Sequence, residues 1–412
     1  MIVKSALHND LKAQFLHWQL ALGRLEQLDD IASVEGWLAL ERHTGTLLRG
    51  TLQKTVRDLI ADAVTVRDRF DRMTPEEIAD ALQRIRRNYL RTETTLDFFA
   101  DAINTRTSTR IAKLLSAADV LAATSMRRIL NPLGHTSPPV VCYIDKGLGA
   151  SILKEGLRLW DRASINPVAM IKVVRHNILR PTSLLHEAGH QVAHILDWND
   201  QLVTALSRVL PSEHGSMWGS WASEIAADAF AFTNAGYAAV AALRNVVDGG
   251  PRAVFRYLPG DPHPIAYLRV LLGVEMCRQA YGSGPWDELS SVWRYRYPLH
   301  SAPADIRTML SDSTTLIPRV AEVTLRQSYE AFGDRSLTQM IDPTQVSPAA
   351  LAQLERTAGP RLYESPYIVN RESLRLLALA GYQFATQPER GAEAMQNQLN
   401  SMLLLGSVQI AA

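Results

Sequence analysis

The sequence lacks the features that mark disulfide-bonded and nucleic-acid-binding proteins. It has only two cysteines in 412 residues, Cys142 and Cys277. Two are too few for a disulfide framework, and neither has a second Cys or a His at metal-ligand spacing. We therefore expect both to be core residues in a reducing compartment. The formal net charge is +1, so bulk charge predicts no nucleic-acid partner.

Long apolar runs are also missing. No stretch of about 18 apolar residues without charges occurs, so we expect no transmembrane helix and no stable membrane insertion. The richest stretch, residues 225–243, carries Asp228 and Asn234 and is more typical of a buried helix. Residues 1–5 lack the basic start, apolar run and cleavage site of a signal peptide. A cytoplasmic protein is expected, and secretion without a cleavable signal is the alternative.

The N-terminal third of the sequence predicts helices. Apolar residues recur at three- and four-residue steps, which indicates helices near residues 10–22, 46–70 and 106–130. Another helix start is sharply defined, because Thr74, Pro75 and Glu77 form a capping box with Pro at the first helical position. The Pro- and Gly-containing segment 131–139 then reads as a linker. We place a helical domain at residues 1–135.

The pattern changes after this linker. Residues 140–144 and 167–174 are typical of strands, and we expect a helix over residues 151–161 between them. Helical periodicity returns after about residue 300, with helix starts near residues 347–348 and 370–372. The sequence thus predicts an α+β fold that is mostly α, with a catalytic domain at residues 136–300 and a helical region at residues 301–412.

A His-Glu-x-x-His pattern carries the clearest chemical information. His186 and His190 are four residues apart on a predicted helix, so both project from one face and can share a zinc ion. Glu187 follows the first His, where its carboxylate can reach a water rather than the metal. Zinc lowers the pKa of bound water, and a neighbouring Glu can take the proton as general base. The pattern predicts a metallopeptidase centre with one Zn²⁺ per chain.

A catalytic zinc needs a third protein ligand. The metzincin pattern requires Gly at position 193 and His at position 196, but the sequence has Ala193 and Leu196. His194 is too far along a straight helix from His186 to share its ion, so we expect it in the surroundings of the site. An Asp or a Glu on a later helix remains.

Glu224 is the best candidate for that ligand. It lies in a segment that predicts a helix starting near residues 219–220, and Asp228 follows one turn later on the same face. Asp228 can accept a hydrogen bond from the outer nitrogen of a ligand His and so fix its tautomer. The alanines around Glu224 predict close packing against the His-Glu-x-x-His helix.

These patterns resemble the gluzincin metallopeptidases. A third element, Asp261 to Arg269, is similar to the His-Pro segment of the CAAX prenyl protease and HtpX-like family. In that family the corresponding His and Arg stabilise the oxyanion, a role that the resemblance gives to His263 and Arg269. Pro262 or Pro264 starts a helix well, so we expect both residues on one helix facing the site. The resemblance covers about residues 181–270.

The resemblance implies a zincin-like metallopeptidase core with flanking helical domains. In zincins a strand before the metal helix lines the cleft and pairs with the extended substrate, and this role falls to residues near 167–176. The family's members are integral membrane proteins, whereas this sequence predicts no span. The motif His-Glu-Ala-Gly-His also resembles that of the FtsH-type proteases, in which an ATPase domain precedes the peptidase. This sequence has no Gly-rich phosphate-binding loop ending in Gly-Lys-Ser/Thr, so that resemblance is weaker.

The sequence therefore predicts a zinc-dependent endopeptidase that acts on a protein or peptide substrate. The large helical flanks favour a restricted set of substrates. Two alternatives stay open: a non-catalytic helical interaction or regulatory protein with a structural zinc, and a secreted effector protease. A structural site has no use for Glu187, so this residue distinguishes the first alternative from an enzyme.

Overall fold

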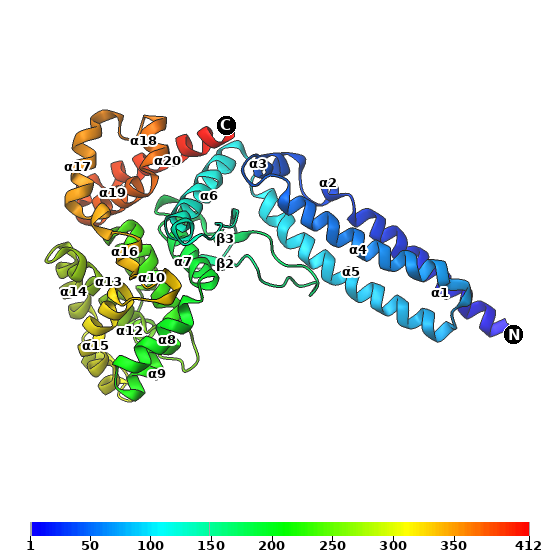
Figure 1. Cartoon of the computed structure of the whole chain (residues 1–412), viewed down its shortest axis with the longest axis horizontal. Helices are drawn as coiled ribbons and strands as arrows, with labels where there is room; N and C mark the ends of the chain where they lie inside the picture. Colours follow the sequence, from blue (N-terminus) through cyan, green and yellow to red (C-terminus); the bar gives the residue numbers. More distant parts are fainter. Residues whose placement is uncertain (1, 148, 412) are drawn as a thin grey trace. The chain divides into compact units, whose positions relative to one another are not determined.

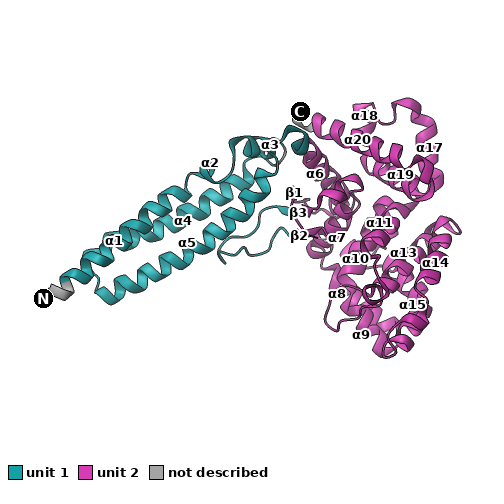
Figure 2. Cartoon of the chain, turned by 180° about the vertical axis from the view of Figure 1, so that it is seen from behind, with its two compact units in different colours: residues 1–112, 153–170 teal, residues 113–152, 171–412 magenta. Residues whose placement is uncertain are grey.

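The computed structural model describes residues 2–147 and 149–411, except for the side chains of residues 2–4, 43 and 409–411. This part of the chain is mostly helical with one small sheet, which confirms the predicted α+β, mostly α class (Figure 1). The chain folds into two compact units (Figure 2). Unit 1 comprises residues 1–112 and 153–170, and unit 2 comprises residues 113–152 and 171–412.

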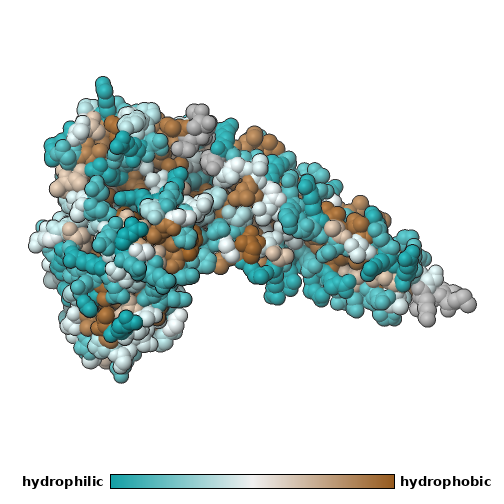
Figure 3. All heavy atoms as spheres, in the orientation of Figure 1, coloured by the Kyte–Doolittle hydropathy of each residue, from teal (hydrophilic) through white to brown (hydrophobic). Residues whose placement is uncertain are grey.

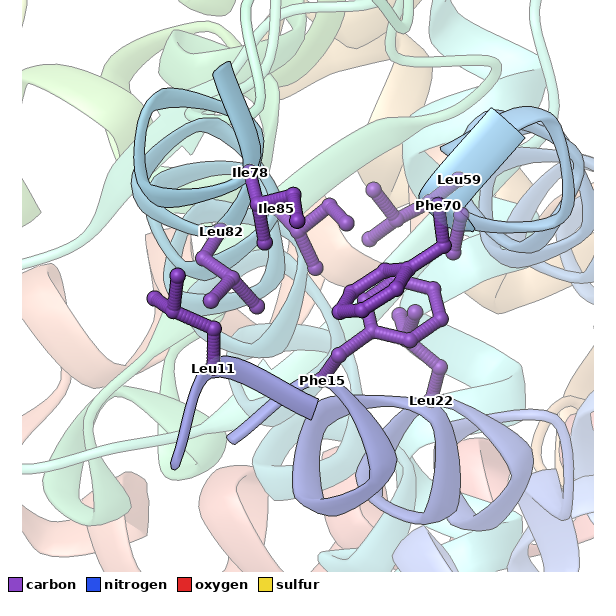
Figure 4. Close-up of a cluster of buried hydrophobic side chains, with 9 residues drawn as sticks. Leu11, Phe15, Leu22, Leu59, Phe70, Ile78, Leu82 and Ile85 are labelled. Atoms are coloured by element: carbon purple, nitrogen blue, oxygen red, sulfur yellow. The ribbon is translucent and has the colours of Figure 1, made fainter. Parts of the chain in front are cut away.

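Unit 1 is built from long helices that lie side by side (Figure 1). Its helices are α1 (Ile2–Leu25), α2 (Leu28–Ile31), α3 (Val34–Thr44), α4 (Leu47–Arg69) and α5 (Pro75–Asn104). Apolar residues at helical spacing on α1, α4 and α5 face one another and form a buried cluster (Figure 4). The cluster contains Leu11, Phe15, Leu22, Leu59, Ala63, Phe70, Ile78, Leu82 and Ile85. Unit 1 therefore has a hydrophobic core of its own.

The predicted capping box is confirmed at the start of α5. The Thr74 hydroxyl accepts a hydrogen bond from the Glu77 backbone N–H at 3.2 Å, and the Glu77 carboxylate accepts one from the Thr74 N–H at 2.7 Å. Two backbone donors that have no partner within the helix are satisfied in this way. The helices expected near residues 10–22, 46–70 and 106–130 are also present, the last as α6 (Thr109–Leu130).

Within the described residues, three strands form a small sheet in the order β1-β3-β2. They are β1 (Val140–Ile144), β2 (Ser151–Leu153) and β3 (Ala169–Val173), so the two predicted strands are confirmed. Because β3 lies between β1 and β2, both of its edges are occupied. The expectation that this strand pairs with an extended substrate is therefore wrong along its paired length.

The helix expected over residues 151–161 is also wrong. The segment begins as β2 and continues as a loop that is closed by an antiparallel bridge between Arg158 and Ile165. The Asn166 side-chain amide donates to the carbonyls of Leu153 and Lys154, and Gly156 has a φ of +85°. Side-chain hydrogen bonds to the backbone and a left-handed glycine compete with the helix in this loop.

Unit 2 contains the helix pair that carries the His-Glu-x-x-His and Glu-x-x-x-Asp patterns. The short helix η3 (Arg175–Leu179) leads into α7 (Ser183–Ile195), which packs extensively against α10 (Ala222–Ala235). The remaining helices are α8 (Trp198–Val209), α9 (Ser212–Ser220), α11 (Tyr237–Val247), α12 (Pro251–Val254), α13 (Ala266–Tyr281), α14 (Pro285–Arg296), α15 (Arg307–Arg326), α16 (Leu337–Met340), α17 (Pro348–Ala358), α18 (Pro366–Arg371), α19 (Ser373–Thr386) and α20 (Gly391–Ala411). The predicted start at residues 347–348 is confirmed, and that at residues 370–372 falls at the junction of α18 and α19.

Small residues allow α7 and α10 to approach closely. A Cβ atom added to Gly189 on α7 would lie 2.9 Å from the Cα of Ala227 and 3.0 Å from the Cβ of Phe230, both on α10. Real Cβ atoms do not sit this close, so only glycine fits at this crossing. The packing predicted from the alanines of α10 is confirmed, and it brings the two patterns onto facing surfaces.

Both cysteines are buried, as predicted, and neither forms a disulfide bond. In the part of the chain that the structure describes, no helix has the length and apolar content needed to cross a membrane. Hydrophilic residues cover most of the face seen in Figure 3, with separate apolar patches between them.

Candidate metal centre

His186 and His190 meet on one face of α7. Their four-residue spacing places the two rings one turn apart, with centroids 4.7 Å from each other. The Nε2 atoms of the two rings are 3.2 Å apart. The helix therefore directs two imidazole nitrogens to the same point.

Glu224 brings a carboxylate to this point from α10. Its Oε1 lies 3.2 Å from Nε2 of His190, and its Oε2 lies 3.4 Å from Nε2 of His186. One ligand atom from each of the three residues lies within 4.8 Å of the others. The predicted set of metal ligands is thus brought together by the close contact of α7 and α10.

Hydrogen bonds on the far side of each ring fix the ring orientation. Asp228 lies one turn after Glu224 on α10, and its Oδ1 is 2.8 Å from Nδ1 of His186. The hydroxyl of Ser223 is 3.2 Å from Nδ1 of His190. When Nδ1 donates to these oxygens, the lone pair of each neutral imidazole is on Nε2, where a metal can bind it. Asp228 lies beside the outer nitrogen of His186, as predicted from its position one turn after Glu224. The contact of Ser223 with His190 was not predicted, although Ser223 directly precedes Glu224.

Arg269 connects the two carboxylates. It lies on α13, is 7% exposed, and places Nε 2.6 Å from Oδ2 of Asp228 and Nη2 2.8 Å from Oδ1. The same Nη2 is 2.9 Å from Oε2 of Glu224. This fork geometry is the strong form of an Arg–carboxylate pair. In this position Arg269 fixes the Glu224 and Asp228 side chains relative to each other.

The electrostatic field at the three ligand atoms favours positive charge. Burial alone lowers the pKa of His186, but the hydrogen bond and charge of Asp228, and then Glu224, raise it to about 10. Burial acts to raise the pKa of Glu224, but hydrogen bonds with His186 and His190 and the charge of Arg269 hold it well below its usual range. The ionised carboxylates that stabilise a proton on His186 would equally stabilise a divalent metal ion bound in its place.

Glu187 is a buried carboxyl beside this group. It is 6% exposed, and among the described residues its carboxylate has no hydrogen-bond or ion-pair partner. Burial raises its pKa, while the nearby His186 and His190 act in the opposite direction. A buried acid without a structural partner is costly to keep. Its placement one residue after His186 therefore points to a chemical role.

His263 stands at the edge of the site, but not on the expected helix. Helix α13 begins at Ala266, so His263 precedes it, and the prediction that it shares a helix with Arg269 is wrong. Asp261 holds His263 in place instead. Its Oδ1 lies 3.0 Å from the His263 backbone N and 2.7 Å from Nδ1 of the His263 ring. The remaining Nε2 is 3.7 Å from Oε1 of Glu224. The ring is 60% exposed.

His194 stays outside the contacts of this site. It lies near the end of α7, is partly buried, and makes no hydrogen bond or ion pair with other residues in the described ranges. Two more turns of α7 carry it away from His186, as the rise of a helix requires.

The donor set fits zinc. In a tetrahedral site with bond lengths of 2.0–2.1 Å, ligand atoms lie about 3.3 Å from one another. In the structure the two Nε2 atoms are 3.2 Å apart, and they lie 3.2 and 3.4 Å from the two different oxygens of the Glu224 carboxylate. Two imidazole nitrogens and one carboxylate oxygen are also a preferred ligand set of zinc. His263 stays outside this group, so the described residues supply three ligands.

No family model matches the chain, and neither a curated protein nor a solved structure is significantly similar to it. Arguments about function therefore depend on the geometry and chemistry of this centre.

Proposed function

We propose that this protein is a zinc-dependent peptidase. His186, His190 and Glu224 hold one zinc ion per chain, and Glu187 is the general base. The observation that carries this proposal is the convergence of the two Nε2 atoms and the Glu224 carboxylate, with separations of 3.2 to 3.4 Å. A zinc-like arrangement of ligands beside a buried, unpaired carboxyl supports hydrolysis in particular.

The residues of the site divide the work of peptide-bond hydrolysis. A bound zinc ion polarises the scissile carbonyl and makes water more acidic. Glu187 takes a proton from the attacking water and delivers it to the leaving amine, for which a carboxyl with a raised pKa is suited. Asp261 holds Nδ1 of His263 so that Nε2 faces the site, and a doubly protonated ring would donate its Nε2–H to the negative charge on the carbonyl oxygen.

A catalytic centre is favoured over a structural one. Structural zinc sites are closed by four protein ligands, whereas catalytic sites use three and leave one position for water or substrate. The described part of the chain offers three such ligands. Glu187 would serve no purpose in a closed site, because it neither binds a metal there nor pairs with another described side chain.

We further propose a gluzincin-type centre in a zincin-like core, with protein or peptide substrates. Support comes from the Glu224 and Asp228 spacing on α10 and from the resemblance of residues 261–269 to the His-Pro segment of the CAAX prenyl protease and HtpX-like family. Arg269 binds Asp228 and Glu224 in this chain, so its proposed contribution is to position them. A restricted set of substrates and a cytoplasmic location complete the proposal.

Metal content tests the ligands directly. Plasma mass spectrometry should find about one zinc per chain in wild type, with the zinc lost in Glu224→Ala and retained in Glu187→Gln. Wild type purified without chelators that holds no zinc would overturn the proposed centre. Zinc unaffected by Glu224→Ala would show that the third ligand is another residue.

Cleavage of a peptide library tests the chemistry. Glu187→Gln should lower kcat by about 10²–10⁴-fold, which is the usual contribution of a general base, while zinc is retained. Glu213→Gln is the matched control, because Glu213 is an exposed acid on α9 and its replacement should leave kcat unchanged. Equal activity of Glu187→Gln and wild type would favour the structural-zinc alternative.

A further inference from the structure

Two exposed apolar residues stand next to each other on the loop that precedes His263. Tyr257 is 38% exposed and Leu258 is 49% exposed, and Pro259 after them is exposed as well. Among the described residues, no other two large apolar side chains that are this exposed are neighbours in sequence. Single exposed apolar residues are common, whereas a run of them on a surface is unusual unless it has a function.

Trp221 holds this loop at one end. The ring of Tyr257 meets the ring of Trp221 edge to face, with centroids 6.4 Å apart. Trp221 is only 1% exposed and directly precedes α10. Glu224 follows three residues later, within one helical turn. Tyr257 therefore packs against the end of α10 that carries the proposed ligand Glu224.

A turn and His263 hold the loop at its other end. The backbone N–H of Asp261 donates to the Leu258 carbonyl at 3.0 Å, and Gly260 has a φ of +84°, which suits the third position of a type II turn. Asp261 in turn binds the ring of His263, whose Nε2 is 3.7 Å from Oε1 of Glu224. These contacts connect Leu258 to the metal centre through a short, hydrogen-bonded path.

A peptide bound at the metal centre is the occupant that this loop favours. The same loop carries the apolar pair and His263, so one extended peptide can contact both. Tyr257 is already held by Trp221, and Leu258 is held by the turn. Because these side chains are fixed before binding, little conformational freedom is lost when an apolar side chain packs against them.

We propose that Tyr257 and Leu258 bind a large apolar side chain of the peptide substrate close to the bond that is cleaved. This inference rests on the proposed peptidase function and adds a specificity to it. The ends of a β-turn lie within about 7 Å of each other, and an extended peptide advances about 3.3 Å per residue. The recognised side chain, such as that of Leu, Met or Phe, therefore belongs to a residue within about four positions of the cleaved bond.

Two sets of fluorogenic octapeptides built from Ala, Gly and Ser test this specificity. Each peptide carries one Leu in the first set, or one Asn of similar size in the second, at each position in turn. Wild type should cleave the best Leu peptide with a kcat/KM at least about tenfold above its Asn counterpart, because burial of a Leu side chain is strongly favourable. Leu258→Asn should lower this ratio at least fivefold, mainly through KM, and Tyr257→Ser is a second variant. Val292→Asn is the control, because Val292 is 52% exposed on α14 and the ratio should stay that of wild type.

Binding to the Glu187→Gln protein separates this site from the proposed chemistry, because that variant should retain zinc without cleaving. Fluorescence anisotropy should show tighter binding of the Leu peptides than of the Asn peptides, and Leu258→Asn added to this protein should remove the difference. Equal binding of the two sets would overturn the apolar site, as would an undiminished Leu preference in both loop variants. Leu-selective binding that depends on Leu258, without cleavage by wild type, would support the site and overturn the peptidase function.

Discussion

The sequence predicted that Arg269 belongs to the site, but it did not predict which residues Arg269 contacts. Its spacing from His263 suggested a group facing the substrate. In the structure its guanidinium forms ion pairs with Asp228 and Glu224, with Nε 2.6 Å from Asp228 Oδ2 and Nη2 2.9 Å from Glu224 Oε2. Two carboxylates from one helix lie together in a buried site, and they repel each other unless a cation lies between them. Arg269 is that cation, and it contacts the same Asp228 Oδ1 and Glu224 Oε2 atoms that His186 contacts.

Replacing Arg269 with Met should destabilise the metal-free protein by about 3–5 kcal/mol, because two buried carboxylates lose their partner. Zinc should recover part of this loss, since it binds the folded state and supplies positive charge to the same carboxylates. Denaturant unfolding with and without zinc measures both effects. Arg278→Met is the control on the same helix, because the exposed Arg278–Asp287 pair should contribute under about 1 kcal/mol. Equal losses in the two variants would contradict the assigned role.

At the scale of elements, the crossing of α7 and α10 decides whether the ligands meet. Neither helix carries all three proposed ligands, since α7 supplies two imidazole nitrogens and α10 supplies the carboxylate. Gly189 lies at the closest approach, facing Ala227 and Phe230. A side chain here must separate the helices, and the separation between the ligands would grow with it.

We therefore expect Gly189→Ala to weaken zinc binding and to lower the free energy of unfolding by about 1–3 kcal/mol, as overpacking in a core usually does. A competition titration with a zinc chelator measures the first effect and denaturant unfolding the second. Gly391→Ala is the matched control, because it begins α20 with helical φ and its added Cβ would meet Phe384 at an ordinary 3.5 Å. That control should be neutral or stabilising by up to about 1 kcal/mol. Wild-type zinc affinity in Gly189→Ala would refute the importance of this crossing.

At the scale of the whole molecule, each unit has its own hydrophobic core. The core of unit 1 includes Phe70, which lies among residues of α1, α4 and α5 (Figure 4). The three proposed metal ligands all lie within unit 2. The stability of the two units should therefore respond to different changes.

Phe70→Ala should destabilise unit 1 by about 3–5 kcal/mol, because it removes a large buried side chain and leaves a cavity. Calorimetry should show one transition moved to lower temperature, with zinc content unchanged. Leu20→Ala is a surface control on α1, since Leu20 is 66% exposed and should change stability by less than about 0.5 kcal/mol. Loss of zinc in Phe70→Ala would show that the units do not fold independently.

Removal of zinc should have the complementary effect. A chelator should lower the melting temperature of the transition that belongs to unit 2 and leave that of unit 1 in place. A ligand present at 1,000 times its Kd stabilises the folded state by about 4 kcal/mol, and this contribution disappears with the metal. Re-addition of zinc should restore the original transition. A chelator that shifts neither transition would contradict a resident metal.

The sequence alone determined the parts of this protein that depend on local spacing. The four-residue steps of His186 to His190 and of Glu224 to Asp228 set which side chains share a helix face, and the Thr74 capping box set a helix start. These features need only neighbours along the chain. The helix expected over residues 151–161 was wrong because a residue outside the segment decides its conformation. The Asn166 side chain donates hydrogen bonds across the loop to the carbonyls of residues 153 and 154.

Only the tertiary structure decided how distant segments meet. It placed β3 between two other strands, turned Arg269 toward Asp228 and Glu224, and held His263 through Asp261 rather than through a helix. It also placed the Arg180 guanidinium against the ring of Phe384 on α19, far along the sequence. Packing between non-local surfaces governs each of these arrangements, and a periodic pattern contains no information about which surface a helix will meet. The chemistry of the ligands was thus set by sequence, and their convergence by the crossing at Gly189.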